Sequence, residues 1–143
     1  MPDEKKEKGK TMQKVNLIGY QVREFHLVQN IQPGNKLRFE NSYSYHATYG
    51  QDQVGRGEMK VTVRDGEDDK RFRLDLTIGG IFRFDPSAEK EEIHAESFKQ
   101  LFPYAKAYIS AVTAAGGLAP VMIPPIDIDD KTVYRVDLHP EDK

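Results

Sequence analysis

Residues 37–49 read LRFENSYSYHATY, and this stretch decides the fold class. Its odd positions are mostly apolar or aromatic, from Leu37 to Tyr49, and its even positions are polar, from Arg38 to Thr48. Side chains of a β-strand alternate between the two faces of a sheet. A period of two over this length therefore predicts a long strand with one solvated face and one face on a core.

Three further segments predict strands that pair with this one. Residues 14–30 are expected to form the first strand, although their alternation is imperfect. Residues 58–64 and 71–84 alternate more regularly, and the Asp-Gly pair at 65–66 between them is a strong hairpin signal. Two glycines at 79–80 inside the last strand indicate a bulge or a sharp bend.

A helix is expected after the strands. Asp85 suits the N-cap and Pro86 the first helical position, and glutamates follow where the helix dipole favours them. Pro103 is expected to kink or divide this helix, and the glycines at 116–117 to end it. Apolar residues at three- and four-residue spacing predict one amphipathic face. This helix stripe consists of Phe98, Leu101, Phe102, Ala105, Tyr108, Ile109 and Val112.

The chain after the helix is apolar but cannot be helical. Residues 118–128 contain Pro120, Pro124 and Pro125, which remove backbone donors and restrict their neighbours. Residues 132–138 suit a short final strand. Strands joined by short turns and followed by one helix predict an α+β fold, a four-stranded antiparallel meander packed with one long kinked helix.

The composition is typical of one globular domain. The chain has 143 residues, 31% of them charged and 38% hydrophobic, and its net charge of -2 gives no electrostatic reason to expect nucleic acid. Residues 1–13 are expected to form a disordered charged tail, 14–138 the domain and 139–143 a second tail. The sequence shows no apolar run typical of a signal peptide or membrane helix, so we expect a cytoplasmic protein.

No pattern in the sequence is typical of an enzyme or a metal centre. There is no cysteine, which excludes disulfides and thiolate metal sites in this chain. His94 lies near three glutamates, but the spacing is not that of a metal site, and a solvated charged face is the simpler interpretation. Nucleophile motifs, phosphate-binding loops and carboxylate pairs placed for acid–base work are also lacking. We expect no catalytic residue, no metal and no cofactor.

Three strings in the sequence are distinctive when taken together. The last long strand ends in Gly79-Gly80-Ile81-Phe82, the helix contains Leu101-Phe102-Pro103-Tyr104-Ala105, and a glycine pair then precedes the proline-rich stretch. In these strings the chain resembles the SecB family of preprotein chaperones, over residues 14–128. The resemblance implies a dimer of dimers with helices between two larger sheets, apolar grooves that hold non-native chains without ATP, and transfer of these clients to the SecA motor.

The sequence departs from the family's pattern in three places. The best-known members have a second helix and a zinc-binding tail, whereas this chain has no cysteine and residues 129–138 read poorly as a helix. The family's motor-docking surface is acidic, and Asp75 matches one position there. However, Arg73 lies two residues earlier, and Val22 and His26 stand where acids are expected. Binding of SecA is therefore in question, and some SecB-like proteins instead protect the antitoxin of a toxin–antitoxin pair.

Two apolar stretches are candidates for a client groove, namely the extended strip after the helix and the end of the first strand. Exposed apolar surface marks binding sites, although packing in the core or against another subunit is the alternative for both stretches. The helix stripe is expected to be core or subunit interface, because a thin sheet with one helix buries little alone. Asp75 is the candidate for motor docking. The groove candidates are Phe25, Leu27, Val28, Ile31, Leu118, Val121, Met122, Ile123 and Ile126.

The sequence therefore predicts an ATP-independent holdase that binds unfolded polypeptides by apolar burial, in protein export or translocation. We expect a homo-oligomer, as a dimer of dimers, with unfolded preproteins or an antitoxin as partners, without nucleic acid and without membrane insertion. One alternative is a SecB-like chaperone of a toxin–antitoxin system. The alternative from another class is a small-molecule-binding α+β domain, which a closed pocket rather than an open groove would favour.

Overall fold

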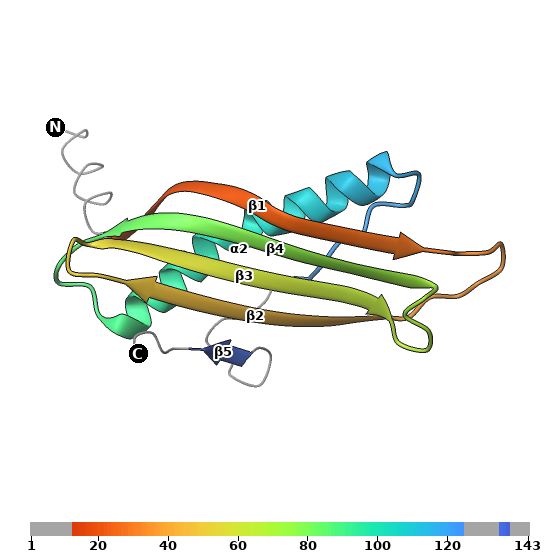
Figure 1. The fold of residues 1–143 in the computed structure, drawn as a ribbon, viewed down its shortest axis with the longest axis horizontal. Helices are drawn as coiled ribbons and strands as arrows, with labels where there is room; N and C mark the ends of the chain where they lie inside the picture. Colours follow the sequence, from red (N-terminus) through yellow and green to blue (C-terminus); the bar gives the residue numbers. More distant parts are fainter. Residues whose placement is uncertain (1–12, 125–134, 138–143) are drawn as a thin grey trace, which may run out of the picture.

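The computed structural model describes residues 13–124 and 135–137, which form a five-stranded sheet and one long helix (Figure 1). The predicted class, a four-stranded antiparallel sheet packed with one long helix, is confirmed and extended by one short strand. The elements are β1 (Val15–Gln29), β2 (Phe39–Tyr49), β3 (Val54–Asp65), β4 (Phe72–Phe84), α2 (Lys90–Ala115) and β5 (Arg135–Asp137).

The order of the strands across the sheet is β1-β4-β3-β2-β5. Strands β2, β3 and β4 follow one another as the expected meander, whereas β1 lies beside β4, so residues 30–38 cross from one side of the sheet to the other. The pairing of β1 with β4 is irregular between Leu17 and Gly19 and again between Val22 and Glu24. These bulges explain the imperfect alternation of the first strand, because each extra residue reverses the faces of those that follow.

The helix begins later than the sequence indicates. Glu89 rather than Asp85 is its N-cap, and the Glu89 backbone N–H donates to the Glu92 carboxylate at 3.5 Å. The Asp85 carboxylate instead accepts from the Ser87 backbone N–H at 2.9 Å and from the Ser87 hydroxyl at 2.7 Å. The predicted start at Asp85 was wrong. An aspartate carboxylate can accept backbone N–H groups either in a turn or at a helix N-cap, so the sequence does not distinguish the two roles.

The rest of the helix agrees with its sequence signals. Pro103 lies inside α2 on its exposed side and does not divide it. The helix ends before the predicted glycine pair, with Gly116 as the C-cap. Gly117 has a φ of +90°, a left-handed conformation that glycine adopts without steric cost.

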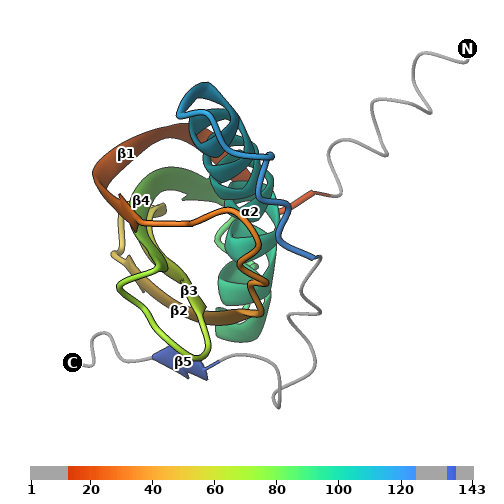
Figure 2. The ribbon, with the colours of Figure 1, turned by 90° about the vertical axis from the view of Figure 1, so that its right-hand side faces the viewer.

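The fold has two layers, because α2 crosses one face of the curved sheet (Figure 2). On β4, Leu74 and Leu76 are buried against the helix, while Arg73 and Asp75 alternate with them on the opposite face. We call the side that packs on the helix the inner face of the sheet and the opposite side the outer face. The core consists of inner-face side chains and the buried side of α2.

Few of the predictions for the two ends of the chain fall on residues that the structure describes. Strand β5 pairs with β2 in parallel and lies within the segment 132–138, where a final strand was expected. The tails predicted at 1–13 and 139–143 lie outside the described residues, apart from Gln13, so the domain boundaries stay a prediction. None of the described helical residues form a segment long and apolar enough to cross a membrane.

Candidate functional site

An apolar hollow of about 330 Å³ opens at the end of the molecule where β1 ends and β4 begins. We call it the end hollow. Its wall combines the loop after β1, the starts of β2 and β4, and the chain that follows α2. Every residue that lines it is apolar, and the set is Ile31, Leu37, Phe39, Phe72, Leu118, Ala119, Pro120 and Val121.

Thr113 in the last turn of α2 holds the segment after the helix in place. Its buried hydroxyl donates to the Ile109 carbonyl at 2.8 Å and accepts from the Val121 backbone N–H at 2.9 Å. The Leu118 N–H also donates to the Thr113 carbonyl at 3.0 Å. These bonds satisfy backbone groups that the prolines leave without strand partners, and they turn the chain back over the sheet. Thr113 could not be identified from the sequence, since a lone threonine near a helix end carries no distinctive signal.

The other wall depends on contacts of the loop after β1. The Asn30 backbone N–H donates to the Arg71 carbonyl at 2.8 Å, which ties this loop to the start of β4. Phe39 packs on Phe72 with ring centroids 5.0 Å apart, and Phe39 remains 41% exposed. Exposed aromatic surface at the mouth of a hollow is available to a ligand. The alternation of residues 37–49 predicted Phe39 in a strand, but no sequence pattern marked it as a groove residue.

The groove candidates at the end of β1 are divided between the faces of the sheet. Only Ile31 lines the end hollow. Phe25 packs edge-on against Tyr108 of the helix at 5.3 Å, and Leu27 is half-buried beside the core. Val28 pairs with Arg73, so it lies on the outer face, where it is 41% exposed.

The candidates after the helix are divided in the same way. Leu118 and Val121 line the end hollow, and Ile123 is buried in the core. Met122 points away from the core and is 69% exposed, with its sulfur 3.5 Å from the Ser110 hydroxyl. The remaining candidate, Ile126, lies outside the described residues.

The helix stripe serves the chain's own core. Two of its residues, Tyr108 and Val112, are half-buried, and the others are buried: Phe98, Leu101, Phe102, Ala105 and Ile109. The apolar surface left on this side comes instead from Tyr104, which stacks on Tyr20 at 4.3 Å. The role of the stripe in an interface stays a prediction.

Asp75 lies on the outer face in a polar cluster. Its carboxylate accepts from Arg73 Nε at 2.9 Å and from the Thr62 hydroxyl at 2.7 Å. The hydrogen bond from Arg73 is the main cause that lowers the pKa of this carboxyl below its usual value. Because Arg73 offsets the charge of Asp75, this carboxylate should attract a basic partner only weakly.

Within residues 13–124 and 135–137, no group of three or more His, Asp or Glu side chains is placed to hold a metal ion. His94, which the sequence placed on a solvated surface, is instead buried at 6% exposure beside the Tyr45 ring. Burial lowers its pKa to about 4. That expectation was wrong because His94 lies on the side of α2 that packs against β2.

Comparisons with known proteins agree in pointing to one family. The family model described as "Preprotein translocase subunit SecB" matches residues 25–139. The protein-export protein SecB of Rhizobium johnstonii is 36% identical over 81 residues, which cover 54% of this chain and 50% of that protein. The Caulobacter vibrioides protein of the same name is 36% identical over 74 residues, 49% of this chain and 45% of the relative. The matched part thus spans about half the length of these curated relatives.

One solved structure has the same fold. It is a SecB-like chaperone from Mycobacterium tuberculosis in complex with a peptide from an antitoxin, with a TM-score of 0.66. The alignment covers 89% of this chain and all of the other, at 12% sequence identity. At this identity the likeness concerns the fold.

Proposed function

The chain belongs to the SecB family, and on that premise we propose that it is an ATP-independent chaperone that holds non-native polypeptides. The observation that carries the proposal is the end hollow, in which Ile31, Leu118 and Val121 come together from distant parts of the sequence. An entirely apolar lining recognises apolar client side chains without regard to their order, because burial is non-directional. Export of preproteins is the role that the names of the curated relatives support.

The chemistry of the end hollow favours binding over catalysis. A catalytic site needs polar groups that converge on a reacting atom, whereas the lining here consists of aliphatic side chains, aromatic rings and a proline. We therefore propose no enzymatic role and no cofactor. A small-molecule site would also need a few polar groups to orient its ligand, which makes that rival the weaker candidate.

Assembly and location belong to the same proposal. Tyr20 of β1 and Tyr104 of α2 stack on each other but remain exposed, which supports a homo-oligomer such as a dimer of dimers. We propose a cytoplasmic holdase whose partners are unfolded preproteins. Asp75 stays a candidate for contact with SecA, although its ion pair with Arg73 argues against strong docking there.

The hollow can be tested with variants that change its half-exposed lining. Ile31→Ser and Leu118→Ser should weaken suppression of aggregation of a denatured model protein, by roughly 1 kcal/mol or about fivefold in client affinity for each variant. Val28→Ser is the matched control, since Val28 is a neighbouring apolar residue of β1 on the outer face. It should hold clients as well as the unmodified chain.

Stability measured on the same variants separates binding from folding. If Ile31→Ser and Leu118→Ser lose client holding while their thermal midpoints stay within a few degrees, the hollow binds clients. Loss of activity in proportion to loss of stability would mean that these residues are structural. Full activity in folded variants would place the client site elsewhere.

A second candidate is a chaperone dedicated to one antitoxin, because the Mycobacterium tuberculosis protein of this fold was solved with an antitoxin peptide. The two roles differ in selectivity. A general export holdase should bind several unrelated unfolded proteins with similar affinity. A dedicated chaperone should prefer one segment by about a hundredfold, which corresponds to roughly 3 kcal/mol.

A further inference from the structure

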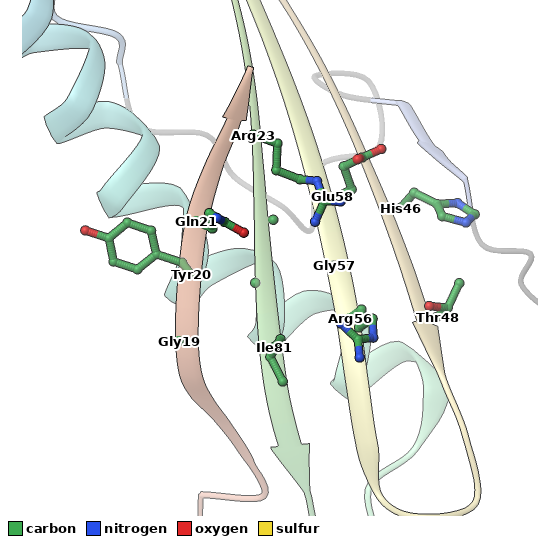
Figure 3. A pocket seen from close by; sticks show the side chains of 12 residues that line it. Gly19, Tyr20, Gln21, Arg23, His46, Thr48, Arg56, Gly57, Glu58 and Ile81 are labelled. Carbon is green, nitrogen blue, oxygen red and sulfur yellow. The ribbon is translucent and has the colours of Figure 1, made fainter. Parts of the chain in front are cut away.

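A second hollow, of about 600 Å³, lies on the outer face of the sheet, away from the helix (Figure 3). We call it the outer hollow. It crosses all four long strands at two neighbouring rows of the pairing register. One row is Gly19, Ile81, Arg56 and Thr48, and the other is Gln21, Gly79, Glu58 and His46. Unlike the end hollow, it is lined mainly by polar and charged side chains.

Two glycines form the floor of the outer hollow. Gly19 has open space where a Cβ would lie, and a Cβ on Gly79 would come within 3.2 Å of Arg23 Cδ. The Arg23 side chain therefore passes over Gly79 and reaches from β1 toward β3, as Figure 3 shows. The bulge between Val22 and Glu24 places Arg23 outside the regular alternation and aims it there.

Two arginines elsewhere on this face are held in ion pairs with carboxylates. Arg64 is paired with Glu40 at 2.9 Å, and Arg73 with Asp75 at 2.9 Å. In the part of the chain that the structure describes, Arg23 and Arg56 form no ion pair, and both are exposed. A guanidinium offers a planar fork of donors that matches a carboxylate, so two unpaired arginines over bare backbone form a receptive surface.

We propose that the outer hollow docks an extended acidic segment of a partner protein, with carboxylates on Arg23 and Arg56 and its backbone over the floor at Gly19 and Gly79. The glycines let a chain approach the sheet closely. Glu58 pairs with Gly79 in the register, two residues from Arg56 along β3, and its carboxylate partly opposes an anionic ligand. This site is on the opposite face from the helix and is separate from the proposed client site.

The test uses a fluorescein-labelled peptide of ten glutamates and anisotropy measurements at low salt. The double variant Arg23→Ala/Arg56→Ala should bind it at least about tenfold more weakly, as expected for loss of two charge-assisted contacts. Arg64→Ala is the matched control, since it removes the same charge from the same face but from an arginine already paired with Glu40. A loss per arginine no larger than that of Arg64→Ala would mean that only overall charge matters and would overturn the proposal.

Two further variants change the site in opposite directions. Glu58→Gln should tighten binding of the peptide, because it removes the carboxylate that repels it, and Gly79→Ala should weaken binding by displacing Arg23. Failure of the glutamate peptide to bind, or tighter binding of a ten-nucleotide single strand, would contradict the assignment. Saturating glutamate peptide should leave the holding of a denatured client unchanged. If the peptide and the client compete, the outer hollow and the client site are not separate, and that part of the proposal is wrong.

Discussion

The inner and outer faces of one sheet show how the same backbone supports two different tasks. On β4, Leu74 and Ile78 are fully buried beneath the helix, whereas Arg73 and Asp75, from the same strand, meet solvent in ion pairs. The inner face has little tolerance for change because its side chains are close-packed. The outer face tolerates change and therefore has room for recognition.

The two hollows differ in origin as well as in chemistry. The end hollow forms where apolar segments distant in sequence meet imperfectly around Thr113, so its shape depends on tertiary packing. The outer hollow forms where side chains are missing, at Gly19 and Gly79, beside the two bulges of β1. Substitutions should therefore affect the first through apolar contact with a client and the second through charge.

The largest expected effect is on the inner face. Leu101 is fully buried between α2 and the sheet, and Leu101→Ala should lower the free energy of unfolding by roughly 2–5 kcal/mol. On the outer face, Arg64→Ala removes only a half-exposed ion pair and should change it by less than about 1 kcal/mol. Urea denaturation of both variants measures the contrast, and similar losses would show that the two faces do not differ as described.

The pH dependence of stability should come from the inner face as well. Both ring nitrogens of His94 are buried without a hydrogen-bond partner among the described residues, and burial lowers the pKa to about 4. The titratable groups around it are Tyr45, Tyr49, Lys90 and Glu91, and His46 adds repulsion. The unfolded chain binds a proton at His94 near pH 6.5 and the folded chain only near pH 4.

Stability should therefore fall as the pH drops from about 6.5 to about 4, by at most roughly 3 kcal/mol. In His94→Phe, the denaturation midpoint should change less with pH across this window. In the control His26→Asn, on the outer face, the dependence of the midpoint on pH should be the same as in the unmodified chain. An unchanged slope in His94→Phe would mean that other groups cause the acid sensitivity.

The smallest effect compares one glycine on each face. A Cβ on Gly57 would clash with the Tyr45 hydroxyl, which a buried 2.7 Å hydrogen bond to Ser97 holds in place. Gly57→Ala should cost roughly 1–3 kcal/mol, as overpacking does. Gly79→Ala meets only the flexible Arg23 and should change stability by less than about 1 kcal/mol, since alanine suits a strand better than glycine. Thermal denaturation of both variants measures this difference. An equal loss of stability in Gly57→Ala and Gly79→Ala would contradict the prediction.

The sequence by itself determined the elements and their faces. The alternation at 37–49, 58–64 and 71–84 and the three- and four-residue spacing of the helix stripe are local patterns, because they follow from the geometry of the strand and the helix. The glycines after α2 ended the helix as expected for the same reason. The strings at 79–82 and 101–105 led to the SecB family, which the family model over residues 25–139 confirmed.

Only the tertiary structure decided which of these apolar residues form a site. The connection at 30–38 is compatible with a neighbouring or a crossing strand, so the pairing of β1 with β4 was not determined by local pattern. That pairing and its two bulges sent Ile31 into the end hollow, Val28 to the outer face and Arg23 across Gly79. Exposure depends on which segments meet across the fold, and a hydrophobic side chain has the same identity in the core and in a groove.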